Sequence, residues 1–214
     1  MKNIFILLIC SVFLSSCLDG LLSSPEEPCN FLQYKNHRVA WESLPLNLFM
    51  DDSTSDIQRE SVLAAIQSIH SQYGKEIFNF VPGVQPSNKW QNNWAKKGIF
   101  PKDNKSSIYW ISTGWPKSQS LKQAVTRTRR RGTSLKEVDI IINSTDFDFF
   151  LNNPDSNKLD LHSLYIHELL HSVGLQHITS DPKSTMKKSL GRGAQPQRRK
   201  LANIDKESLK CEYN

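Results

Sequence analysis

The sequence predicts an α+β domain, and three features of the chain support this prediction. Short apolar runs bounded by turn residues predict strands at residues 45–50, 77–81 and 107–111, and two more strands within residues 124–143. Apolar residues recur at helical spacing after residue 53 and again after residue 160. Residues 38–214 provide enough chain for one domain of ordinary size.

The first helix is predicted over residues 53–73. Its apolar stripe consists of Ile57, Val62, Ala65, Ile66 and Ile69. Gly74 is expected to end the helix. Residues 82–106 contain tryptophans and prolines without a clear period, so we expect a long surface loop there.

Two strands are predicted on either side of a turn at Gly132. Threonine and arginine alternate before the turn, and the run 138–142 that follows, apolar except for Asp139, is typical of a strand buried in a sheet. The strand before the turn carries Arg127, Arg129, Arg130 and Arg131. Charged side chains also protect an edge strand from aggregation, which is one explanation for these arginines.

The segment HELLHSVGLQH, residues 167–177, follows the spacing H-E-x-x-H-x-x-G-x-x-H. Given the composition of this chain, its five fixed positions would coincide by chance with a probability on the order of 10⁻⁵. His167 and His171 are four residues apart and therefore share one helix face. Gly174 can end the helix in a left-handed conformation, which lets His177 reach the same ion. The spacing predicts a three-histidine Zn²⁺ site with an open fourth position.

Glu168 lies beside this site without being needed as a ligand, which suits a general base. A zinc-activated water that gives its proton to Glu168 would hydrolyse a peptide bond, so the segment predicts a zinc-dependent endopeptidase. Asp160 is the expected N-cap of the helix, which is apolar on nearly every side. The alternatives are a closed structural site or histidines satisfied in the core. Structural zinc usually has four protein ligands, often cysteines, and no cysteine lies nearby.

The eleven-residue segment resembles the zinc-binding motif of the metzincin metalloproteases, and residues 159–186 are most similar to the matrixin branch. Weaker features extend the resemblance to residues 38–213. They are an N-terminal β/α unit, the EVDIIIN segment before the motif and the C-terminal LANIDKESLKCEY segment. The resemblance implies a zincin-like fold. This fold has a twisted mixed sheet with an antiparallel edge strand, a backing helix, an active-site helix and a C-terminal helix.

The resemblance also assigns further roles. Met186 would lie in a tight turn beneath the metal, unless it is an ordinary buried methionine. The edge strand before Gly132 would line the cleft, bring its arginines near the substrate, and pair with a protein or peptide segment bound as an extended strand. A second basic group, in the segment that shapes the leaving-group side of metzincin clefts, consists of Arg192, Arg198, Arg199 and Lys200. From this group we hypothesise a preference for acidic residues near the cleaved bond, against the alternative of a solvated basic surface.

The chain departs from the matrixin pattern at several positions. Leu170 replaces the usual glycine, and Lys187 and Lys188 replace the usual residues after the methionine. Lys188 is either solvated or takes the role of an additional group near the metal. A loop rich in histidine and aspartate, which binds structural zinc in matrixins, is not evident. Carboxylates at Asp146, Asp148 and Asp155 could serve Ca²⁺ or belong to a solvated loop.

The N-terminus predicts the location of the protein. Residues 1–16 have one lysine, an apolar run and small residues, which is typical of a secretory signal and too short for a spanning helix. The sequence LSSC resembles a bacterial lipobox and predicts lipidation of Cys17, although an ordinary secretory signal is the alternative. Residues 17–37 would form the lipidated tether and residues 38–214 the catalytic domain. We expect a lipid-anchored protein of the bacterial cell envelope, at the outer membrane, facing the periplasm or the surface.

Two cysteines remain after the leader and the lipidated residue. Cys10 lies in the signal, so Cys29 and Cys211 are left as a pair in an oxidising compartment. We expect a disulfide between them, with two free thiols as the alternative.

Three function classes are compatible with these residues. The favoured class is an active zinc endopeptidase, acting as a monomer and without a specific nucleic-acid partner. The second is a catalytically silent, zinc-bearing surface lipoprotein used for adhesion. The third uses the net charge of +6 and the arginine clusters to bind polyanions, with an affinity that falls steeply with salt.

Overall fold

The computed structural model describes residues 29–50, 54–81 and 102–214. The signal, Cys17, residues 18–28 of the tether and most of the loop expected at 82–106 lie outside the described residues. None of the helices in the described ranges is long and apolar enough to span a membrane.

A five-stranded sheet forms the centre of the fold, in the order β4-β3-β5-β7-β6. Its strands are β3 (Leu46–Met50), β4 (Phe78–Val81), β5 (Ser106–Ile111), β6 (Ala124–Arg131) and β7 (Ser134–Asn143). Four strands are parallel, and β6 pairs antiparallel with β7 at one edge. These observations confirm the α+β class and the twisted mixed sheet with an antiparallel edge strand.

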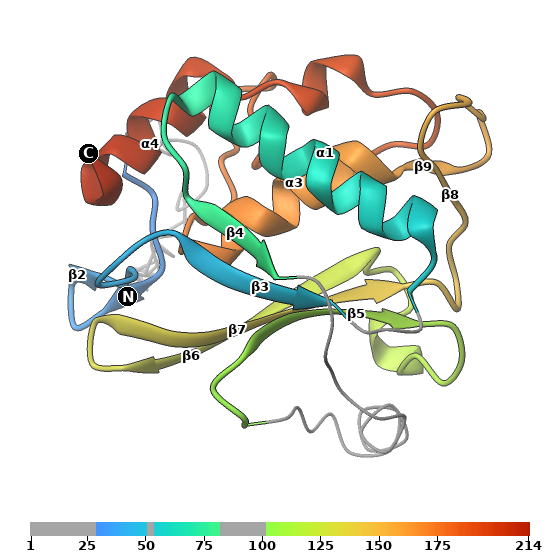
Figure 1. The fold of residues 1–214 in the computed structure, drawn as a ribbon. Coiled ribbons are helices and arrows are strands. Elements are labelled where there is room, and N and C mark those ends of the chain that lie inside the picture. Colours follow the sequence, from blue (N-terminus) through green and yellow to red (C-terminus); the bar gives the residue numbers. More distant parts are fainter. Residues whose placement is uncertain (1–28, 51–53, 82–101) are drawn as a thin grey trace, which may run out of the picture.

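Helix α1 (Asp56–Tyr73) packs along one face of this sheet (Figure 1). Ser55 begins it with a capping box, accepting from the backbone N–H of Gln58 while the Gln58 side chain accepts from the backbone of Ser55. Gly74 ends it at a φ of 84°. The predicted stripe is buried except for Ile57, which lies in the first turn and is 62 % exposed.

Helix α3 (Leu161–Ser172) lies on the same face of the sheet as α1, contacts α1, β6 and β7, and carries the histidine motif (Figure 1). Leu161, Leu164, Ile166 and Leu169 are among its residues in the main core. Tyr165 is fully buried, and its hydroxyl accepts a hydrogen bond of 2.8 Å from Trp110 Nε1 on β5. Apolar contacts on both sides therefore fix the helix rigidly against the sheet.

Shorter elements complete the described part of the chain. They are β1 (Gln33–Tyr34), β2 (His37–Arg38), β8 (Phe149–Phe150), β9 (Leu159–Asp160), the 3₁₀ turns η1 (Lys117–Gln119) and η2 (Pro196–Arg199), and α4 (Asn203–Tyr213). The helix α4 matches the C-terminal helix expected from the sequence.

Residues 29–37, with which the described part of the chain begins, belong to the folded domain. Cys29 and Cys211 form the expected disulfide, with their Cα atoms 5.6 Å apart. Phe31 is only 1 % exposed, and the backbone N–H of Leu32 donates to Gly174 O at 2.7 Å. From the sequence we expected residues 29–37 to belong to the tether. The disulfide, the buried Phe31 side chain and the Leu32 hydrogen bond instead make this segment part of the folded domain.

Candidate metal centre

The N-terminus of α3 is anchored by Asp160. As predicted, its carboxylate caps the helix, accepting from Ser163 N at 3.3 Å. Arg199 adds a two-pronged ion pair, in which Nε and Nη2 each lie 2.9 Å from one carboxylate oxygen. Asp160 is fully buried, so this charge-assisted pair fixes the start of the helix.

Gly174 turns the chain away from the end of α3, as predicted. Its φ is +102°, a conformation that L side chains rarely adopt. An added Cβ would lie 2.6 Å from Val39 O and 3.0 Å from the Phe31 ring, so the surroundings also leave no space for a side chain at this position. The turn brings His177 back to the face of α3 that carries the other two histidines.

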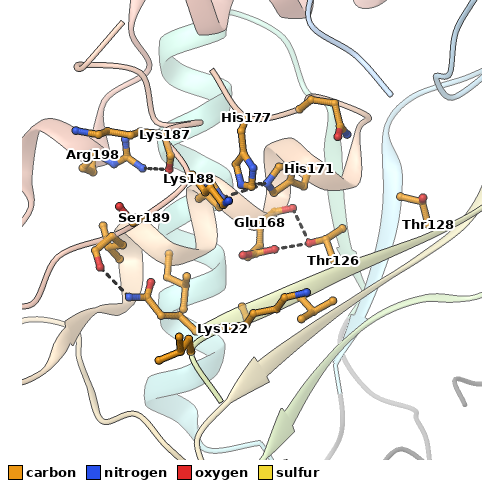
Figure 2. Close-up of a pocket in the computed structure, with 18 of the residues that line it drawn as sticks. Lys122, Thr126, Thr128, Glu168, His171, His177, Lys187, Lys188, Ser189 and Arg198 are labelled. Carbon is orange, nitrogen blue, oxygen red and sulfur yellow. Dashed lines mark hydrogen bonds between the residues drawn. The ribbon is translucent and has the colours of Figure 1, made fainter. Parts of the chain in front are cut away.

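The three motif histidines converge on one point, and Figure 2 shows His171 and His177 turned toward each other. Nε2 of His171 lies 3.1 Å from Nε2 of His167 and 3.2 Å from Nε2 of His177. Zinc–imidazole bonds of about 2.0–2.1 Å at tetrahedral angles would separate the nitrogens by about 3.3 Å. The two separations from His171 are close to this value, so the three rings could hold one metal ion.

The tautomers of two histidines are fixed by backbone carbonyls. Nδ1 of His167 lies 2.7 Å from Thr185 O, and Nδ1 of His171 lies 2.7 Å from Leu175 O. A carbonyl only accepts, so each Nδ1 must carry the proton, and each neutral ring directs an Nε2 lone pair inward.

These inward lone pairs favour a bound cation. Burial is the main cause that lowers the pKa of both rings, that of His167 to well below its usual value, so the rings are neutral. Two lone pairs 3.1 Å apart with no proton between them repel each other. A divalent ion at their meeting point would remove this repulsion, and the donor set fits Zn²⁺.

The turn around Met186 supports His167, because the Thr185 carbonyl in this turn contacts the Nδ1 of the ring. Met186 is fully buried, and its carbonyl accepts from Ile178 N at 3.0 Å, which ties the turn to the segment after His177. Asp205 on α4 holds the turn, accepting from the Thr185 N–H and hydroxyl at 2.9 Å each. A chain of contacts therefore runs from Asp205 through Thr185 to the His167 ring. Met186 is buried in this turn, its role beneath a metal stays a prediction, and the sequence did not indicate Asp205.

Glu168 is buried beside the histidines, with 5 % of its surface exposed. Thr126 on β6 donates a hydrogen bond of 2.6 Å to its Oε2 (Figure 2). Burial raises the pKa of Glu168 to about 7, and the bond from Thr126 opposes this rise because it favours the carboxylate. A carboxyl group with this pKa can take and return a proton near neutral pH.

A pocket of about 650 Å³ opens over the histidines and Glu168. It is lined by Leu32, residues 121–126, Thr128, Leu164, His167, Glu168, His171, Gln176, His177, residues 187–190 and Arg198. Figure 2 shows Thr126 and Thr128 of the edge strand on one side and Lys187, Lys188 and Arg198 on the other. The edge strand therefore borders the pocket, but its arginines are not among the lining residues.

The alternation of β6 explains the placement of these arginines. Thr126 and Thr128 face α3 and the pocket, so the side chains of Arg127 and Arg129 point to the opposite face of the sheet. Arg129 pairs there with the buried Glu137, and the Arg130 guanidinium lies 3.9 Å from the centre of the Tyr34 ring. The arginine side chains of this strand therefore do not line the pocket, and the expectation that they sit near the substrate stays a prediction.

The four residues of the second basic group lie in different environments. Of Arg192, Arg198, Arg199 and Lys200, only Arg198 lines the pocket. Arg199 is committed to Asp160, Arg192 donates to Asn157 O, and Lys200 is exposed outside the pocket. Because these side chains have partners or positions elsewhere, the group does not act as a unit.

The histidine triad is the one group of three or more His, Cys, Asp or Glu side chains placed to hold an ion within residues 29–50, 54–81 and 102–214. Asp146, Asp148 and Asp155 are not brought together. Asp146 accepts from Asn143 Nδ2 at 3.0 Å, and Asp155 pairs with Lys158. These partners account for two of the three carboxylates expected to serve calcium.

No protein-family model matches the chain, and no curated protein matches it. The chemistry of the centre is therefore inferred from its own residues.

Proposed function

We propose that this protein is a zinc-dependent endopeptidase of the metzincin type, with a matrixin-like catalytic domain of zincin-like fold. The observation that carries the proposal is the convergence of three imidazole nitrogens beside a buried carboxylate at an open pocket. The parallel sheet with one antiparallel edge strand, the two helices on one face and the buried Met186 also support it.

The donor set favours a catalytic zinc over a structural one. Structural zinc is usually enclosed by four protein ligands, whereas catalytic zinc has three and leaves one position to solvent. The three histidines face a pocket of about 650 Å³, and no fourth His, Cys, Asp or Glu ligand joins them among the described residues. This open side also argues against a silent surface protein with an occluded cleft.

The side chains around the centre can perform the proton transfers of peptide hydrolysis. Zinc bound there would supply a Lewis acid that polarises a carbonyl and makes water more acidic. Glu168 accepts a proton from the attacking water as the new C–O bond forms. It then delivers that proton to the departing nitrogen as the C–N bond breaks, and Thr126 orients its carboxylate throughout.

The edge strand β6 provides a place for the substrate backbone. In the described sheet β6 pairs with β7 on one side, and its residues Ala124, Val125, Thr126 and Thr128 border the pocket on the other. An extended peptide can add to such an edge through main-chain hydrogen bonds, which would place its scissile bond beside Glu168. The proposed substrate is therefore a peptide or an extended protein segment.

The proposed location follows from the leader and the lipobox-like sequence. Residues 1–16 would be removed and Cys17 lipidated, so that the enzyme is anchored in the bacterial cell envelope. The Cys29–Cys211 disulfide is consistent with an oxidising compartment of this kind.

The replacement Glu168→Gln tests the function directly. We expect the variant to bind one zinc as the wild type does, while its hydrolysis of a peptide library falls by a factor of at least about 10³. Glu60→Gln is the matched control, because it makes the same change at an exposed position on α1. Equal hydrolysis by the Glu168→Gln variant and the wild type would exclude the proposed mechanism.

A further inference from the structure

Cationic side chains dominate the charge of the pocket. Its lining includes Lys122, Lys187, Lys188 and Arg198, whereas the only carboxylate among the described lining residues is Glu168, which belongs to the reactive centre. Figure 2 shows Lys187, Lys188 and Arg198 together to one side of the histidines. A zinc ion at the histidines would add further positive charge.

These four cations lack the ion pairs that neutralise basic residues elsewhere. Arg129 and Arg199 each pair with a buried carboxylate. None of the four cations in the pocket forms an ion pair with any residue in the described part of the chain. Their charge is therefore available to a ligand in the pocket.

Arg198 is the most unusual of the four because it is only 5 % exposed. Its guanidinium donates to the carbonyl of Ser184 and, at 2.7 Å, to that of Lys187. These bonds use two of its five N–H donors. Asp205 is near enough to act on the guanidinium through its charge, but its oxygens accept from Ser184, Thr185 and Ala202.

A buried guanidinium without an ion pair is costly, and an anion in the adjoining pocket would offset that cost. The pocket also presents apolar surface, from Val125, Leu164 and Leu190, that could contact the methylene groups of a side chain. Gln123, which directly precedes β6, donates from Nε2 to Leu190 O at 2.7 Å. This bond connects the two sides of the pocket, residues 187–190 and the start of β6.

We propose that the part of the pocket between residues 187–190 and η2 binds a carboxylate-bearing side chain of the substrate, with Arg198 as the principal recognition group and Lys187 and Lys188 as supporting charges. This inference rests on the proposed peptidase function and names its substrate preference. The earlier hypothesis of acidic preference relied partly on Arg192, Arg199 and Lys200, which the structure does not bring to the pocket.

A single side chain fits this arrangement better than a long polyanion. A polyanion needs a basic track across the surface, but Arg129 of the β6 cluster is paired with Glu137, and Arg130 lies over Tyr34. The cations without ion pairs are gathered in one concave pocket instead. Binding of a polyanion is therefore treated as a competing outcome of the test.

The test uses peptides that carry glutamate or glutamine at each position within three residues of a mapped cleavage site. We expect wild-type hydrolysis to favour glutamate by about tenfold in kcat/KM at one position next to the cleaved bond. Lys187→Gln/Lys188→Gln should reduce this ratio several-fold, and Arg198→Gln should remove most of it. Lys200→Gln, an exposed change in the same segment, should leave the ratio unchanged.

Arg198 also supports the Met186 turn, so its variant needs a folding check. Because the two lysines are exposed, their double variant tests the proposal even if Arg198→Gln does not fold. Equal hydrolysis of both peptides, a glutamate preference that no pocket variant changes, or variant effects confined to binding of a sulfated polysaccharide would each overturn the proposal.

A binding measurement separates this inference from the proposed function. Zinc-loaded Glu168→Gln protein should bind the glutamate peptide about tenfold more tightly than the glutamine peptide, without turnover. If the wild type cleaves no peptide but this preference is observed, the recognition proposal is supported and the peptidase function fails. If both peptides bind equally, the recognition proposal fails.

Discussion

The hydrogen bond between Thr126 and Glu168 should set the pH range of activity. Thr126→Val removes the hydroxyl that donates to Glu168 Oε2 at 2.6 Å but keeps the side-chain shape. This bond favours the ionised carboxylate, so its loss raises the pKa of Glu168. A hydrogen bond to a charged group contributes about 1.5–3 kcal/mol, which corresponds to about 1–2 pKa units.

The general base must be ionised to accept a proton, so activity is lost as the pH falls through the pKa of Glu168. The acidic limb of the kcat/KM profile should therefore move upward by about 1–2 pH units in Thr126→Val. Thr126→Ser retains a hydroxyl and should largely preserve the profile, and Thr133→Val changes an exposed turn residue and should have no effect. An unshifted acidic limb in a folded, zinc-loaded Thr126→Val protein would refute this role of Thr126.

Three further changes test the supports of the centre. Gly174→Ala should unfold the protein at lower denaturant and weaken zinc binding, because its Cβ would lie 2.6 Å from a carbonyl oxygen at a φ of +102°; unchanged stability would contradict this geometry. Asp205→Asn should weaken zinc binding roughly tenfold in a metal-competition titration, since it loosens the Thr185 carbonyl that orients His167; wild-type affinity would show that the connection is not needed. Reduction of Cys29–Cys211 should lower the free energy of unfolding by up to about 5 kcal/mol in denaturant titrations, a prediction that fails if the midpoint does not move.

Local spacing explains why much of the centre could be predicted from the sequence. The i, i+4 relation of His167 and His171 and the turn at Gly174 are properties of a single helix and its end, so they do not depend on the rest of the fold. The Asp160 cap was predictable for the same reason.

The residues that support the centre were harder to predict because they come from distant parts of the chain. Thr126 lies 42 residues before Glu168, and Asp205 lies 20 residues after Thr185. The sheet order and the packing of α4 bring these pairs together, and neither follows from local pattern. One signal was available for β6, since its threonine and arginine alternation already places Thr126 and Arg127 on opposite faces.

The boundary of the folded domain was placed too late for a related reason. Phe31 and Leu32 form an apolar pair too short to show a helical or strand period, and the burial of Phe31 against Gly174 depends on a contact with a segment more than a hundred residues away. The nearby Cys29 was the available signal, because a disulfide to Cys211 requires this segment to reach the C-terminal helix.

Zinc K-edge absorption spectroscopy on the purified, zinc-loaded protein tests the central claim most directly. The geometry of His167, His171 and His177 predicts one zinc per chain, with three imidazole nitrogens at about 2.0–2.1 Å and one further oxygen ligand from solvent. His167→Ala should lose the ion. A protein that takes up no zinc, or a spectrum with sulfur ligands at about 2.3 Å, would contradict the proposed centre.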